Sequence, residues 1–234
     1  MTKGKRFVGR WQVSETSGAV LAVDVLRAFT TAAYAFGAGA SCILLVDSVA
    51  EALALKADHP GSLAIGEDRG RRPDGFDLPN SPVEVSRADV AGRTLIQRTS
   101  AGTRGVAAAR SATRLWCASL VCASATAEAV AASGLGEPTY LITGRFQDRP
   151  DRDGYDDLVT AELIERARLG QDLDAARTAK AVATSYEAAL TLALGSGHVH
   201  PEDIDYAVRV DCFDFAMEVV RAHGLLWLEA DPSP

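Results

Sequence analysis

Three carboxylates, Asp24, Glu67 and Asp77, stand after short apolar runs or in a loop that follows one. Such positions place side chains near the carboxyl ends of strands, where α/β sheets bind their ligands. Carboxylates suit a hard divalent cation such as Mg²⁺, which takes one or two of them together with water and phosphate oxygens. Arg27 follows Asp24 by three residues and can turn toward the same opening. We therefore predict that these four residues are catalytic and that the three carboxylates bind Mg²⁺. The alternative for Asp24 is a cap on the next helix.

A loop rich in hydroxyl groups covers residues 98–105 (RTSAGTRG) and precedes a predicted helix. Backbone N–H groups at a helix start carry partial positive charge and favour phosphate. Glycine lets the backbone approach a ligand closely, and arginine offers two parallel contacts to an anion. The alternative is a polar loop with a helix cap. We predict phosphate contacts from Arg27 and from five residues of this loop: Thr99, Ser100, Gly102, Thr103 and Arg104.

Three further positions have both a structural and a functional interpretation. The triplet Asn80-Ser81-Pro82 is typical of a helix start, and Asn80 is in addition a candidate ligand group. Ser119 follows a predicted strand but lacks the GxSxG setting of a nucleophile, so it is predicted to be a structural or ligand-binding hydroxyl. Asp157 favours the start of its helix electrostatically, and it is also within reach of the predicted pocket. No Cys/His cluster has the spacing of a zinc site.

Strands alternating with helices must position these residues. Apolar runs such as 19–25, 42–46 and 94–97 indicate buried strands, and Ala-rich segments between them indicate helices, the longest over 175–194. His223-Gly224 is typical of a hairpin turn and predicts at least one antiparallel edge. The sequence therefore predicts a single α/β domain over residues 1–234, with a largely parallel sheet covered on both faces and a C-terminal hairpin.

Composition excludes several classes of protein. The net charge of −7 disfavours a general nucleic-acid binder, which needs a basic face. The apolar runs are far shorter than a membrane span, so no membrane partner is expected. The N-terminal stretch MTKGKRFVGRWQV lacks the apolar segment of a secretory signal. The four cysteines form no CxxC pair and are expected to be free thiols in a reducing compartment, so we expect a cytoplasmic protein.

Five motifs in this order make the sequence resemble the 2-phosphosulfolactate phosphatase family. They are VDVLRAFTT, GE, GFDLPNSP, GRTLIQRTSAGT and ASLVCASA, at residues 23–31, 66–67, 75–82, 92–103 and 118–125. The resemblance implies a three-layer α/β/α fold. It also implies a Mg²⁺-dependent phosphatase, a phosphoric monoester hydrolase, that converts 2-phospho-3-sulfolactate to 3-sulfolactate and phosphate in coenzyme M biosynthesis.

Some residues depart from the family pattern. Ala101 stands where the family's TTNGT loop has an amide, Pro79 replaces a glycine, and residues 147–153 form a charged insertion. These departures leave two alternatives open: a non-catalytic anion-binding homologue, or a phosphatase for another small phosphorylated acid. The nucleophile is either metal-bound water or Asp24. A homodimer is one candidate assembly.

Overall fold

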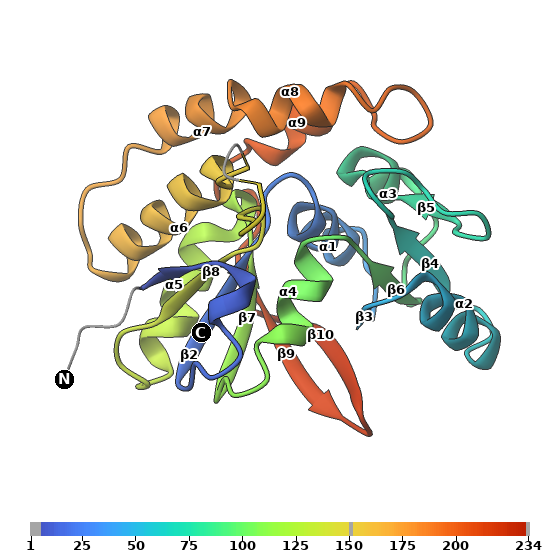
Figure 1. The fold of residues 1–234 in the computed structure, drawn as a ribbon, viewed down its shortest axis with the longest axis horizontal. Coiled ribbons are helices and arrows are strands. Elements are labelled where there is room, and N and C mark those ends of the chain that lie inside the picture. Colours follow the sequence, from blue (N-terminus) through green and yellow to red (C-terminus); the bar gives the residue numbers. More distant parts are fainter. Residues whose placement is uncertain (1–5, 150–151, 233–234) are drawn as a thin grey trace.

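The computed structural model describes residues 6–149 and 152–232 (Figure 1). The strands are β1 (Phe7–Val8), β2 (Ala19–Val23), β3 (Cys42–Val46), β4 (Leu63–Gly66), β5 (Leu78–Pro79), β6 (Thr94–Arg98), β7 (Arg114–Ala118), β8 (Thr139–Ile142), β9 (Phe215–Ala222) and β10 (Leu225–Pro232). The α-helices are α1 (Ala28–Gly37), α2 (Val49–Asp58), α3 (Pro82–Arg87), α4 (Gly102–Ala108), α5 (Ala123–Ala132), α6 (Tyr155–Arg168), α7 (Ala175–Ala183), α8 (Tyr186–Leu192) and α9 (Asp203–Ala207). Two 3-10 turns, η1 (Arg10–Gln12) and η2 (Leu120–Cys122), complete the secondary structure of the described residues.

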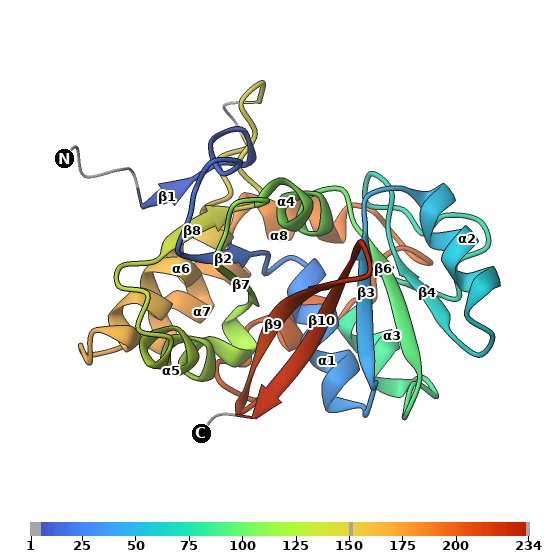
Figure 2. The same ribbon diagram turned by 90° about the horizontal axis from the view of Figure 1, so that it is seen from below.

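All the strands belong to one mixed sheet, in the order β1-β8-β2-β7-β9-β10-β3-β6-β4-β5. The strands β1, β8, β2 and β7 form one parallel set, and β3, β6, β4 and β5 form another. The hairpin β9–β10 pairs antiparallel with β7 on one side and with β3 on the other. Figure 2 shows this twisted hairpin between the two sets. The predicted C-terminal hairpin is confirmed, but it lies inside the sheet rather than at an edge.

The hairpin turn has the backbone that its sequence indicates. His223 and Gly224 both have positive φ, 53° and 77°, and Leu225 pairs directly with Ala222. Two central residues with positive φ define the turn whose twist matches that of the flanking strands. The local sequence therefore fixes the hairpin, while its place in the sheet depends on contacts with distant strands.

Alternating strand residues face opposite sides of the sheet, and each side has its own apolar core. One face packs Ala22, Ile43 and Leu115 against α1, α3 and α4. On the other face, residues such as Leu21 and Trp116 pack against α5, α6 and α7, and the β3–β6–β4 side packs against α2. The predicted three-layer α/β/α arrangement is confirmed.

Element boundaries follow the sequence patterns closely, with two exceptions. The predicted helix over 175–194 is two helices, because the Ser185 side chain accepts a hydrogen bond from Ala188 N and begins α8 anew. Weak alternation of apolar and polar residues over 5–13 predicts a short strand, but only Phe7–Val8 pairs with β8, and η1 follows. All four cysteines are free thiols. None of the helices within the described residues has the length and apolarity that a bilayer crossing requires.

Candidate active site

A cleft of about 900 Å³ opens among loops that follow several strands of the sheet. This volume lies in the range of ordinary small-molecule sites. Its walls come from the loops after β2, β4, β6 and β8, from the start of α6, and from α8. The residues that line it carry both signs of charge. Those predicted as site residues are Asp24, Arg27, Glu67, Asn80, Thr99, Ser100 and Arg104.

The two parallel sets of strands bring their carboxyl ends together at this cleft. Gly102 begins α4 after β6, and Asp24 follows β2 in the other set. A Cβ atom at Gly102 would lie 2.8 Å from Asp24 Oδ2 and 2.7 Å from Ala28 Cβ. Position 102 therefore has no room for a side chain. The glycine is needed for the close approach of these two loops, which the sequence pattern alone does not show.

Asp24 is buried at the bottom of the cleft, with 5% of its surface exposed. Its Oδ1 accepts the N–H of Ala28 at 2.9 Å, and its Oδ2 accepts the Thr143 hydroxyl at 3.0 Å. Burial raises the pKa of Asp24 from 3.8 to about 6, although the two hydrogen bonds oppose this. The contact satisfies the N–H of Ala28 in the first turn of α1, although Arg27 and not Asp24 occupies the N-cap position. Because Asp24 also lines the cleft, this hydrogen bond and the site interpretation are compatible.

Two more buried carboxylates, Asp156 and Asp157, enter the cleft from the first turn of α6. Burial, followed by the charges of Glu187 and Asp24, raises the pKa of Asp156 to about 8. Burial and the charges of Asp156 and Asp24 raise the pKa of Asp157 well above its usual range. Thr143 Oγ1 lies 3.0 Å from Asp24 Oδ2 and 3.4 Å from Asp157 Oδ2, so it bridges two of the acids. The cleft thus gathers carboxyl groups whose ionised forms are disfavoured by burial and by the charges of their neighbours.

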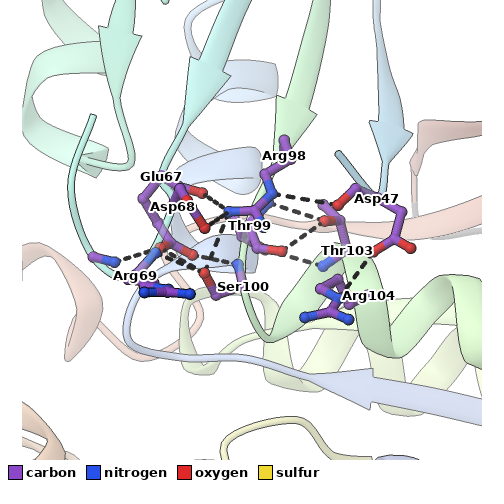
Figure 3. Close-up of polar contacts among 10 residues, drawn as sticks. Asp47, Glu67, Asp68, Arg69, Arg98, Thr99, Ser100, Thr103 and Arg104 are labelled. Carbon is purple, nitrogen blue, oxygen red and sulfur yellow. Dashed lines mark hydrogen bonds and ion pairs between the residues drawn. The ribbon is translucent and has the colours of Figure 1, made fainter. Parts of the chain in front are cut away.

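Glu67 lines the cleft, but its oxygens already have partners (Figure 3). One oxygen accepts the N–H of Ser100, and the other accepts the N–H of Gly70 and, at 3.0 Å, the Ser100 hydroxyl. Ser100 Oγ also accepts the N–H of Arg69 at 2.8 Å. Glu67 therefore ties the loop after β4 to the loop after β6. Glu67 and Ser100 both line the cleft as predicted, but their contacts with each other stabilise its wall.

The other hydroxyls of the loop after β6 are engaged within the loop (Figure 3). Thr99 Oγ1 accepts the N–H of Thr103 at 3.0 Å, and Thr103 Oγ1 accepts the N–H of Thr99 at 2.9 Å. Arg98 is buried, and its Nη1 donates to Glu67 O and to Asp68 Oδ1, the latter at 2.8 Å. Arg104 is different, because it is about half exposed at the cleft and pairs with Asp47 at 2.9 Å. Of these groups, Arg104 is best placed to contact a ligand.

Asp77 does not lie in the cleft, contrary to the prediction. Its carboxylate accepts the N–H of Ala64 at 2.7 Å and pairs with Lys56 at 2.8 Å. The register explains the error. Strand β5 pairs in parallel with β4 so that Pro79 lies opposite Gly66, which sets Asp77 back beside the start of β4. The residue that emerges at the carboxyl end is Asn80.

Asn80 is 4% exposed and lines the cleft. Within the described residues its Oδ1 is buried and has no hydrogen-bond partner. A buried polar atom without a partner is costly, and a bound ligand can satisfy it. The helix-start interpretation belongs to its neighbour, since Ser81 Oγ caps α3 by accepting the N–H of Glu84. Ser81 therefore fills the helix-start role, and the ligand role of Asn80 stays a prediction.

Ser119 is fully buried and is absent from the lining of the cleft, contrary to its predicted role in substrate binding. Its hydroxyl is hydrogen-bonded to the hydroxyl of Thr30, which in turn donates to Val25 O. These contacts join the end of β7 to α1 beneath the cleft. Ser119 is a structural hydroxyl, which was the other interpretation of its position.

The described residues contain no group of three or more His, Cys, Asp or Glu side chains that could hold a metal ion. The predicted ligand set of Asp24, Glu67 and Asp77 is thus not assembled. Asp24, Asp156 and Asp157 nevertheless line one cleft, and each has its pKa raised by burial. Sequence reasoning missed Asp156 and Thr143. Two acidic residues at the start of a helix are common in proteins, so the sequence alone does not show that Asp156 and Asp157 line the cleft.

The fold and the cleft define a three-layer α/β protein with a cleft at strand ends that is lined by acids and arginines. Residues 9–222 match the family described as 2-phosphosulpholactate phosphatase. The chain is 41% identical over 172 residues to a Thermus thermophilus protein named "Probable 2-phosphosulfolactate phosphatase", covering 71% of this chain and 70% of that protein. A Bacillus subtilis protein with the same name is 32% identical over 200 residues, covering 85% and 86% of the two chains. This chain belongs to the 2-phosphosulfolactate phosphatase family.

Proposed function

We propose that the protein is a Mg²⁺-dependent phosphatase that hydrolyses 2-phospho-3-sulfolactate to 3-sulfolactate and phosphate. The observation that carries the proposal is the single cleft in which Asp24, Asn80 and two arginines, Arg27 and Arg104, face one space. Family membership supports the substrate class, since the relatives in Thermus thermophilus and Bacillus subtilis are named for this ester. The reaction breaks the P–O bond of the ester and transfers the phosphoryl group to water.

The arginines and Asn80 bind the substrate in this proposal. Guanidinium groups hold phosphoryl oxygens by paired, charge-assisted hydrogen bonds. Arg27 and Arg104 stand where they can hold the phosphoryl group and stabilise the charge that its oxygens carry during transfer. The amide of Asn80 lines the same cleft and can donate through its Nδ2 to an oxygen of the ester, while its Oδ1, which has no partner among the described residues, can accept a hydrogen bond from a water molecule bound beside the substrate.

Asp24 is the proposed reacting carboxylate. With a pKa of about 6 it is mostly ionised at neutral pH, yet basic enough to accept a proton. Its lone pairs toward Ala28 N and Thr143 Oγ1 are used, which fixes the carboxylate in one orientation. A carboxylate held in this way orients the attacking water and takes up its proton.

The carboxyl groups gathered in the cleft suit a divalent cation, because a cation stabilises their ionised forms. Asp24, Asp156 and Asp157 are buried in one cleft, where burial and, to a lesser extent, the charge of Asp24 raise the pKa of both α6 acids. Mg²⁺ needs only one or two carboxylates when water and phosphate complete its shell, so a finished set of three is not required. We propose that Asp24 and Asp156 would hold the ion, because both oxygens of Asp157 already accept backbone N–H groups. When bound, the ion would supply positive charge to the site.

The insertion after β8 is the proposed determinant of substrate choice. Phe146, Asp148, Arg149 and Arg152 line the cleft, and Phe146 N donates to Arg152 O at 3.1 Å. The guanidinium of Arg152 lies 5.9 Å from the Phe146 ring. A second anionic group of the substrate, such as a sulfonate, requires cations of this kind at the mouth of the site.

Phosphate release from a panel of esters tests this function. We expect the highest kcat/KM with 2-phospho-3-sulfolactate, lower values with 2-phospholactate, which lacks the sulfonate, and little turnover of phosphoserine. Equal rates for the first two esters would contradict the proposed sulfonate recognition. No release from any ester, together with measurable binding of phosphate, would favour the non-catalytic alternative, for which Ala101 in the cleft wall is the relevant departure.

A further inference from the structure

A buried ion pair joins the cleft to the C-terminal part of the chain. Arg27 Nη1 lies 2.7 Å from Asp203 Oδ2, and the two side chains are 3% and 0% exposed. Removing two charges from water is costly unless their geometry and further hydrogen bonds compensate. Asp203 is the first residue of α9, 176 positions after Arg27, and no motif in the sequence pointed to it.

The Asp203 carboxylate has donors from several directions. Its Oδ1 accepts the Ser81 hydroxyl at 2.6 Å, and its Oδ2 accepts the N–H of His200 at 3.0 Å as well as Arg27. One side chain therefore joins the loop after β2, the start of α3 and the segment before α9. The carboxylate is held rigidly enough to fix whatever pairs with it.

Arg27 uses only one of its nitrogens for these internal contacts. Nη1 donates to Asp203 Oδ2 and, at 3.0 Å, to His198 O. These two bonds account for both hydrogens of Nη1. The described contacts give no partner to Nη2 or Nε, and Arg27 lines the cleft. The edge of the guanidinium formed by Nη2 and Nε remains for an anion, in the paired geometry that oxyanions favour.

We propose that Asp203 is a positioning residue: it holds Arg27 by one nitrogen so that the opposite edge of the guanidinium faces the anion in the cleft. The inference rests on the proposed function for the identity of that anion, a phosphoryl group. A purely structural ion pair would stabilise the packing of α9 without affecting how Arg27 meets a ligand.

A double-mutant cycle separates these roles. The four proteins are wild type, Asp203→Asn, Arg27→Gln and the double variant. The readouts are the Kd for inorganic phosphate by calorimetry and kcat/KM for 2-phospho-3-sulfolactate. We expect Asp203→Asn to weaken phosphate binding about tenfold in the wild-type background, the lower end of a charge-assisted contact. In the Arg27→Gln background the same change should cost less than about twofold. Equal losses in both backgrounds would overturn the proposal.

Two further variants serve as controls for this cycle. Ser81→Ala removes another partner of the same carboxylate and should change the Kd by less than about twofold. A loss as large as that of Asp203→Asn would mean that Asp203 acts through α3, against the proposal. Arg27→Lys keeps the charge that pairs with Asp203 but has no second edge. It should lose phosphate affinity as Arg27→Gln does while keeping its Tm, and retained affinity would contradict the inference even if Asp203→Asn fails to fold.

The two proposals can fail separately. If the effects of Asp203→Asn and Arg27→Gln on phosphate binding depend on each other but no ester is hydrolysed, the positioning role stands and the phosphatase function does not. Turnover with an uncoupled cycle would retain the function and remove the role of Asp203.

Discussion

Replacing Asp24 by asparagine should stabilise the protein at pH 8 and remove its activity. Burial raises the pKa of Asp24 from 3.8 to about 6. At 1.36 kcal/mol per pKa unit, ionised Asp24 therefore lowers the free energy of unfolding by about 3 kcal/mol. The penalty arises because the folded protein holds a charge that the unfolded chain keeps in water. It is therefore absent below about pH 4, grows as the pH rises toward 6, and is complete above that.

Asparagine has the shape that the site requires. Its Oδ1 can accept the N–H of Ala28 as the carboxylate does. Its amide nitrogen replaces Oδ2 and can donate to Thr143 Oγ1, which retains Asp157 as an acceptor at 3.4 Å. The tight contact with Gly102 remains possible because the two side chains have nearly the same volume. The full 3 kcal/mol is therefore an upper limit, equivalent to about 6–12 °C in Tm for a chain of this size.

The assay compares wild type and Asp24→Asn by thermal unfolding at pH 8 and pH 4.5 without metal, and by phosphate release at pH 7.5. We expect a Tm gain at pH 8 that shrinks at pH 4.5, and a fall in kcat of at least about 100-fold. A Tm difference that is the same at both pH values would refute the assignment of the penalty to ionisation. Asp77→Asn is the matched control, because Asp77 lies outside the cleft beside Lys56, and its kcat should stay within about twofold.

Other variants test the remaining assignments. Asn80→Ala should lower kcat/KM roughly 3–12-fold with little change in Tm, since its Oδ1 has no described partner to lose; a Tm loss with unchanged kinetics would contradict this. Ser119→Ala should lower the free energy of unfolding by about 1 kcal/mol and leave kcat and KM unchanged, because the hydroxyl contacts Thr30 below the cleft. Arg104→Ala should raise KM about tenfold with a small effect on Tm, since its ion pair with Asp47 is half exposed; an unchanged KM would place Arg104 outside the binding site.

Local sequence patterns were enough to predict most of the fold. Apolar runs such as 42–46 coincide with β3, and the pair His223-Gly224 has the positive φ values of the turn it indicates. The position of the hairpin between two parallel sets could not be predicted, because it depends on pairing between strands about 100 and 180 residues apart. Such long-range pairing leaves no local signal in a single sequence.

Several residues predicted for the site line the cleft in the loops after β2, β4 and β6, whereas strand register removes Asp77 and burial beneath the cleft removes Ser119. Asp24, Glu67 and Arg104 line the cleft as expected, whereas the register of β5 exchanges Asp77 for Asn80. Hydroxyl groups in the loop after β6 looked like ligand groups, but Thr99 and Thr103 bind each other. The same residue types stabilise a loop and bind an anion, so only the geometry of the folded protein distinguishes the two roles.

The most direct test of the account is the rate of phosphate release from 2-phospho-3-sulfolactate by metal-stripped protein as Mg²⁺ is added back. The proposed function predicts background release in chelator and a saturable rise with Mg²⁺, because a cation held by Asp24 and Asp156 would offset the negative charge of the entering ester. The same additions should raise the Tm of the wild type more than that of Asp24→Asn. Full activity in excess chelator, or no release at any Mg²⁺ concentration, would contradict the account.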